Sequence, residues 1–310
     1  MPIPLLLWGA AAALAATGVV KGVQASNMRD EAKEIGDAAE AKYKKHLASI
    51  EKTEESTKKT LEHLGALKLK IFTNHIQFLV DAIKRSKPTN STLKNYSEDF
   101  NVEQIKEYER MILKSLDLEK GIAAGTAGGA LAAMGAYSAV GALAAASTTT
   151  GIATLSGAAA TNATLAWLGG GALSAGGFGM AGGMVALGGI VLGPALAIGG
   201  FFLASQAEEA LTKAQAYSAK TDEACAKIEL AAVGMAAVCT SAKELATIIA
   251  ELARRFDMVK VSDDRDPAKF AQMLAVGRSL KKSLDISILD KEGKAIKNIS
   301  TKHSGLLTLN

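Results

Sequence analysis

Apolar residues recur at helical spacing along the first polar part of the chain. Between residues 26 and 85 they follow one another at intervals that are mostly three, four or seven, as in Ile35, Ala39, Tyr43, Leu47, Ile50, Leu61, Leu64, Ile71, Phe78 and Ile83. This pattern is typical of one apolar stripe on a long α-helix. The segment lacks proline, so we predict a rod of about 90 Å at 1.5 Å per residue. The polar residues around Pro88 should end it.

Two further stripes follow. One begins near Asn101 and predicts a helix running towards Gly121, and the other covers residues 208–256. Because the stripes of residues 26–85 and 208–256 are long and flank the same apolar region, we predict that the two rods pack antiparallel as an elongated all-α bundle. The alternative is that each stripe packs on a partner protein.

The end of the chain is less regular. Pro267 suits the first turn of a helix, so we predict a short helix over residues 268–284. Residues 286–299 are compatible with a small hairpin or a frayed tail. The resulting plan has five parts. They are an apolar N-terminal helix (residues 1–25), a long helical tail with a second helix (26–120), a hydrophobic head (121–207), a long C-terminal helix (208–257) and a short helix with a tail (258–310).

The head is distinguished by its lack of charge. Residues 121–207 contain no Asp, Glu, Lys, Arg or His, and 47 of these 87 residues are Gly or Ala. Because Gly and Ala contribute little to partitioning into lipid, this segment is poised between a packed protein interior and a bilayer. Its most apolar part, residues 172–204, predicts a tilted or re-entrant hairpin. The residues expected to contact lipid are Leu173, Met184, Leu187, Ile190, Leu192, Phe201 and Phe202.

Glycines spaced four apart recur in this head. Such spacing lets helix backbones approach closely in lipid as well as in water. We therefore predict tight helix packing at Gly121, Gly125, Gly129, Gly179, Gly183, Gly189, Gly193 and Gly199.

The first twenty residues carry no charged side chain, and three interpretations remain open. They could form a cleaved signal peptide, although the first basic residue, Lys21, follows the apolar run instead of preceding it. They could form a single membrane anchor. They could also form a small-residue helix that packs on the head.

Composition narrows the chemistry. Aromatic residues are scarce at 5%, which favours long helices over a β-sandwich. The 35 basic and 31 acidic residues are interleaved, so nucleic acid is not an expected partner. Cys225 and Cys239 would lie about 21 Å apart on one helix, beyond disulfide reach. No convergent nucleophile, phosphate loop or paired metal-ligand spacing occurs, so we expect no catalytic residue, metal or cofactor.

The run LSGAAATNATLAWLGGGALSAGGFGMAGGMVALGGIVLGPALAIGGF, residues 155–201, resembles bacterial glycine-zipper proteins with flanking long helices. The plan of a long helical tail with an apolar head is similar to α-helical pore-forming toxins of the cytolysin A and haemolysin BL type, and loosely to apolipoprotein L channel domains. The second resemblance is one of architecture only, and it implies pore formation by analogy instead of by motif.

Three functional hypotheses follow. The first is a pore-forming protein that hides its head in a soluble bundle, then inserts it into a membrane as a homo-oligomer. The second is a constitutive membrane-anchored scaffold whose coiled coil recruits an unidentified protein. The third is a soluble helical protein with a small-residue core. The first two place the chain in the cytoplasm and at a membrane, with secretion left open.

Overall fold

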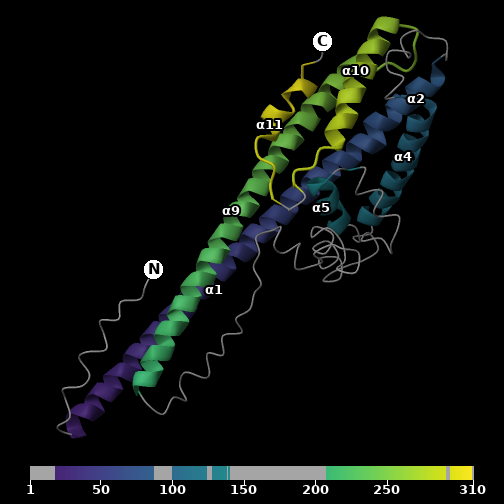
Figure 1. The fold of residues 1–310 in the computed structure, drawn as a ribbon. Coiled ribbons are helices and arrows are strands. Elements are labelled where there is room, and N and C mark those ends of the chain that lie inside the picture. Colours follow the sequence, from purple (N-terminus) through teal and green to yellow (C-terminus); the bar gives the residue numbers. More distant parts are fainter. Residues whose placement is uncertain are drawn as a thin grey trace. The chain divides into compact units, whose positions relative to one another are not determined.

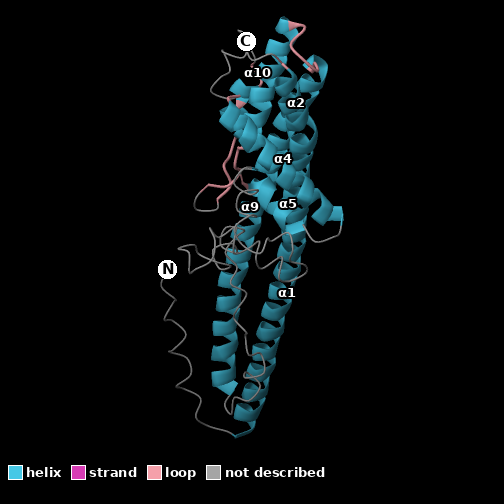
Figure 2. Cartoon of the chain, turned by 90° about the vertical axis from the view of Figure 1, so that its right-hand side faces the viewer, coloured by secondary structure: helices cyan, strands magenta, loops and turns pink. Residues whose placement is uncertain are grey.

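The computed structural model describes residues 18–86, 100–123, 128–137, 139, 207–290 and 294–308. These ranges contain helices and no strand, apart from an isolated antiparallel bridge between Leu289 and Ala295. The all-α prediction is therefore confirmed (Figures 1 and 2). The helices are α1 (Gly18–Lys70), the π-helix η2 (Ile71–Ile76), α2 (Gln77–Arg85), α4 (Val102–Ala123), α5 (Gly128–Ala136), α9 (Ala207–Val259), α10 (Pro267–Leu284), α11 (Ile299–Lys302) and the 3₁₀-helix η6 (Ser304–Leu306).

Local sequence explains where several helices begin. The Asn101 side chain accepts a hydrogen bond from the Gln104 backbone N–H at 2.8 Å, which caps the start of α4. Asp266 does the same for Lys269 at 3.1 Å, and Pro267 occupies the first turn of α10 as predicted. Each cap satisfies a backbone donor that the helix itself leaves unpaired.

The rod of residues 26–85 contains a π-helical turn that its 3.6-residue pattern did not predict. Ile71, Phe72 and Ile76 in this turn are all buried. A π turn adds a residue to the helical repeat and changes the direction in which the following stripe faces. The buried face of α2, with Leu79, can therefore differ in direction from the stripe of α1.

The chain divides into two compact units, and α1 and α9 contribute to both. Met1–Ala48 and Leu192–Lys227 form the first unit, and Ser49–Val191 and Ile228–Asn310 form the second. In the first unit Ala32 of α1 and Ala210 and Ala214 of α9 form one buried cluster, and Ile35 and Leu211 pack against it. Alanine side chains bury little apolar area, so this cluster contributes less to stability than large buried side chains would.

The second unit holds the main core. It gathers the later part of α1 with η2 and α2, the later part of α9, and helices α4, α5 and α10 (Figure 2). Phe72, Phe256, Phe270, Leu245 and Ile249 are among its fully buried side chains. Full burial of side chains of this size typically contributes 1.5–3 kcal/mol each.

The structure corrects the predicted direction of packing, because α1 and α9 run parallel. In the second unit the Cys239 thiol lies 3.5 Å from the Thr57 hydroxyl, and His75 lies 3.4 Å from Asp257. From the first contact to the second, the residue number rises by 18 on α1 and by 18 on α9, as parallel helices require. In the first unit Lys42 of α1 pairs with Asp222 of α9 at 2.8 Å, and this earlier contact fits the same parallel direction.

The physical reason is the length of the connection between these helices. Parallel neighbouring helices need a long connection that returns the chain to the same end of the bundle, and residues 86–206 are long enough for it. The helix that packs beside α2 is α4, which follows it in the chain. Glu109 of α4 accepts a hydrogen bond from Lys84 of α2 at 2.6 Å.

A cysteine at position 57 tests this parallel register. In a Cys225→Ser background, Thr57→Cys should form a disulfide with Cys239 under mild oxidation, because the two side chains already touch. Peptide mapping by mass spectrometry would detect the link. Lys58→Cys, exposed and turned by about 100° on the helix, should remain reduced. Linkage of residue 58 but not 57 would contradict the register.

Candidate docking site of the glycine-rich segment

The first part of the charge-free segment is docked on α1 through two glycines. A Cβ atom added to Gly65 of α1 would lie 1.9 Å from the Leu131 carbonyl oxygen of α5. One added to Gly135 of α5 would lie 2.1 Å from the Leu61 carbonyl oxygen of α1. Each glycine therefore faces the backbone of the other helix. Only residues without a Cβ permit this approach, which also favours Cα–H···O contacts.

The sequence of α5 suits a helix that is covered on several sides. Its residues are GGALAAMGA, without a charged side chain. Leu131 and Met134 are buried in the core of the second unit, as is Ala139 just beyond the helix. This part of the predicted head thus belongs to the folded bundle.

A buried lysine lies one turn beyond Gly65. Lys68 is 0% exposed, and its ammonium donates hydrogen bonds to the Tyr137 carbonyl oxygen at 2.7 Å and to the Ile286 carbonyl oxygen at 3.0 Å. These carbonyls follow the C-termini of α5 and α10, where backbone acceptors lack helical partners and the helix dipoles are negative. Lys68 therefore joins two helix ends to α1.

Burial dominates the electrostatics of this lysine. Desolvation lowers the pKa of Lys68 to about 7, and the nearby Asp285 carboxylate opposes the effect. Asp285 also pairs with Lys281 at 2.8 Å, so its charge is shared. Such a low pKa is the expected consequence of enclosing an ammonium group away from water.

The C-terminal segment completes the α5 docking site, which we define as Gly65, Lys68, Gly135 and residues 286–288. The Ile288 backbone N–H donates to the Ala136 carbonyl oxygen at 3.0 Å, and the Ser287 hydroxyl lies 3.3 Å from the same oxygen. The Leu289–Ala295 bridge follows directly. Of the two interpretations of residues 286–299, the structure thus supports a minimal hairpin, closed by this one bridge, and residues 286–288 cap α5.

The predicted site residues are placed only in part. Gly121 lies in α4 and Gly129 in α5. Gly125, the four predicted packing glycines from 179 to 193, Gly199 and all seven expected lipid-contact residues lie outside the described residues.

Sequence reasoning missed Gly65, Gly135 and Lys68, although two signals were present. Gly65 is an isolated glycine in a helical stripe, where it costs about 1 kcal/mol relative to alanine unless a close approach requires it. Lys68 occupies a core position of the stripe, four residues after Leu64 and four before Phe72. A lysine at a core position of a helical stripe predicts that its ammonium group is buried and paired with an acceptor.

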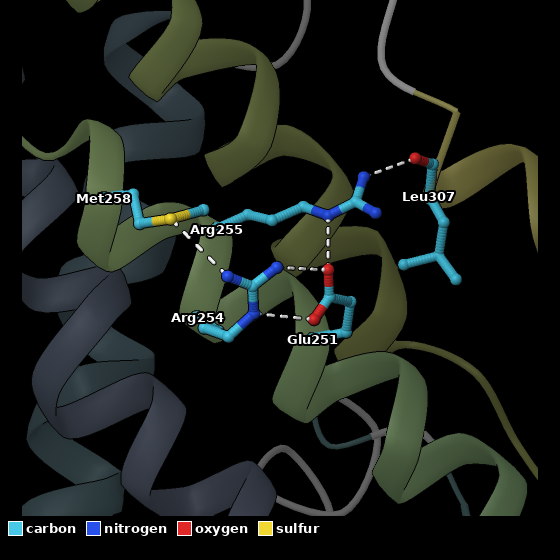
Figure 3. Close-up of polar contacts among 5 residues, drawn as sticks. All are labelled: Glu251, Arg254, Arg255, Met258 and Leu307. Atoms are coloured by element: carbon cyan, nitrogen blue, oxygen red, sulfur yellow. Dashed lines mark hydrogen bonds and ion pairs between the residues drawn. The ribbon is translucent and has the colours of Figure 1, made fainter.

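A second polar cluster fixes the end of the chain on α9 (Figure 3). Glu251 accepts hydrogen bonds from Arg254 and Arg255, each at 2.8 Å, and Arg255 also donates to the Leu307 carbonyl oxygen. The Arg254 and Arg255 guanidinium groups lower the pKa of Glu251 to about 2. The carboxylate therefore stays charged and orients Arg255 towards the C-terminal turn.

Helix α9 also has membrane-like composition. The stretch Glu208–Val259 is long and apolar enough to cross a membrane, and only 33% of its most apolar window is buried. Leu230 and Val233 on this helix are 73% and 67% exposed. By length and composition alone, this is weak evidence for membrane association.

Among the residues that the structure describes, no three His, Cys, Asp or Glu side chains could hold a metal ion. Cys225 and Cys239 are free thiols on α9. Comparison with protein-family models, curated proteins and solved structures found no match to this chain. Its function is therefore inferred from its own chemistry.

Proposed function

We propose that this protein is non-catalytic and inserts its charge-free segment, residues 121–207, into a membrane, where it oligomerises into a pore. The observation that carries the proposal is the absence of charge over 87 residues that are more than half Gly and Ala. Insertion of such a segment costs no charge desolvation, and its small residues support helix packing in lipid.

The α5 docking site suggests how the segment is held before insertion. Backbone approach at Gly65 and Gly135 depends on van der Waals contact, which a lipid or a neighbouring subunit can replace. Two conformations of similar free energy are the requirement for such an exchange. The bundle of the second unit then serves as the soluble holder, with the cytoplasm as the expected compartment.

A second function, a constitutive membrane-anchored scaffold, is favoured by a different observation. Helix α9 itself passes the length and composition test for a membrane span. As a span it would have to leave α1, exposing Leu245 and Ile249, which are now buried. Extraction distinguishes the two functions, because an anchored scaffold needs detergent, whereas an inserting protein is recovered in buffer and binds added liposomes.

The double substitution Leu187→Asp and Ile190→Asp tests insertion. A carboxylate at the bilayer centre costs roughly 2.5 to 3.5 kcal/mol by insertion scales, so liposome flotation and dye release should fall at least 100-fold. The control is Val102→Asp with Leu113→Asp, which adds the same charge at exposed positions of α4.

Circular dichroism melting must accompany flotation, because the same carboxylates buried in a soluble core would also destabilise the protein. Lost binding with a wild-type melt places the membrane contact at Leu187 and Ile190. Unchanged flotation and dye release would refute insertion of this segment.

A further inference from the structure

A groove between α1 and α9 in the second unit has the charge of an anion-binding site. Its volume is about 780 Å³, and it is lined from both helices. The ionisable lining residues are Lys52, Glu55, Lys59 and His63 of α1 and Lys243 of α9. Three lysines thus face one carboxylate.

This positive charge is only partly compensated. Glu55 pairs with Lys59 at 3.2 Å, in an exposed interaction of little energetic weight. Lys52 and Lys243 make no ion pair with any other described residue.

The acidic residues closest in sequence to Lys243 are engaged elsewhere. Glu244 accepts hydrogen bonds from the Ser300 backbone N–H at 3.0 Å and from its hydroxyl at 3.2 Å. Glu251 is held by Arg254 and Arg255. On α1, partial burial raises the pKa of Glu62, which is not among the residues that line the groove. The side chains that line the groove therefore carry more positive than negative charge, which attracts anions.

We propose that this groove binds a phosphate-bearing anion, either phospholipid headgroups or a free polyphosphate. Lys52 and Lys59 are seven residues apart, which is about 10.5 Å along the helix. That distance exceeds a single phosphate and suits two or more linked or adjacent phosphates. Ammonium groups bind phosphate as point charges and need no fixed fork geometry, so exposed lysines suffice. The headgroup source rests on the proposed membrane function, but the site does not.

Titration calorimetry with inorganic triphosphate tests the site without any lipid. Lys52→Gln with Lys243→Gln should weaken binding at least tenfold. The matched control, Lys45→Gln with Lys220→Gln, removes two exposed charges from the same helices outside the groove and should bind as the wild type. Equal affinities for the groove variant and the control would overturn the proposal.

Flotation distinguishes the two sources. If phosphatidylglycerol in phosphatidylcholine vesicles increases wild-type binding and the groove variant loses that increase, the ligands are headgroups. If the lipid has no effect while triphosphate binding remains, the ligand is a free phosphate compound. The Leu187→Asp and Ile190→Asp variant should bind triphosphate normally, so failure of insertion is separable from failure of the groove.

Discussion

Replacement of Gly65 by alanine should detach α5 from α1 and lower the stability of the second unit by about 3 kcal/mol, at the upper end of overpacking costs. The added Cβ would lie 1.9 Å from the Leu131 carbonyl oxygen, and a backbone atom cannot move aside as a flexible side chain can. Gly135→Ala should act similarly, because its Cβ would lie 2.1 Å from the Leu61 carbonyl oxygen. A loss of this size should lower Tm by roughly 6–12 °C.

The same substitution elsewhere in α1 and α9 provides the control. A Cβ added at Gly36 or Gly234 would meet nothing within 4 Å. Alanine there should therefore stabilise the helix, by up to about 1 kcal/mol. Calorimetry of the four variants measures the contrast. If Gly65→Ala melted at or above the wild-type temperature, close helix approach at this position would be disproved.

Lys68 should make stability depend on pH in the alkaline range. Its pKa falls from 10.5 to about 7 on folding, because burial disfavours the charged form. Between these values the unfolded chain holds a proton that the folded chain has released, so raising the pH favours the folded state. Its contribution to the free energy of unfolding should rise by about 1.4 kcal/mol per pH unit from pH 7 to 10.5 and remain constant below pH 7.

Urea denaturation of Lys68→Met measures this contribution by difference. The wild type should gain roughly 2–3 kcal/mol of stability over the variant between pH 7.5 and 9.5. Methionine leaves the carbonyl oxygens of Tyr137 and Ile286 without their lysine donor, but that cost does not depend on pH. Lys70→Met, at an exposed position of the same helix, should keep the wild-type slope. Parallel pH profiles for wild type and Lys68→Met would show that folding does not lower the pKa of Lys68.

The sequence was a good guide to the helices themselves. The stripe of residues 208–256 became α9, Ala207–Val259, and the helix predicted over residues 268–284 became α10, Pro267–Leu284. Periodic burial of one face determines such elements, and it is visible in the residues alone.

Direction and close contacts were harder to predict. A stripe of apolar residues has no polarity, so the stripes of α1 and α9 were compatible with either orientation until contacts such as Thr57 with Cys239 fixed it. Glycine repeats along one helix are visible in the sequence, whereas Gly65 and Gly135 form a pair with one glycine on each of two helices. The acceptors of Lys68 lie far away in sequence, at residues 137 and 286, so the sequence does not identify them.

Parallel pairing also affects how the chain can fold during synthesis. Residue 42 of α1 meets residue 222 of α9, a sequence separation of 180. At 5–20 residues per second, roughly 10–35 s pass before that partner is made. Until then the stripe of α1 lacks its α9 partner, and contacts of such long range form slowly. The apolar stripe of α1 therefore waits longer for its partner than that of α9, which is synthesised when α1 already exists.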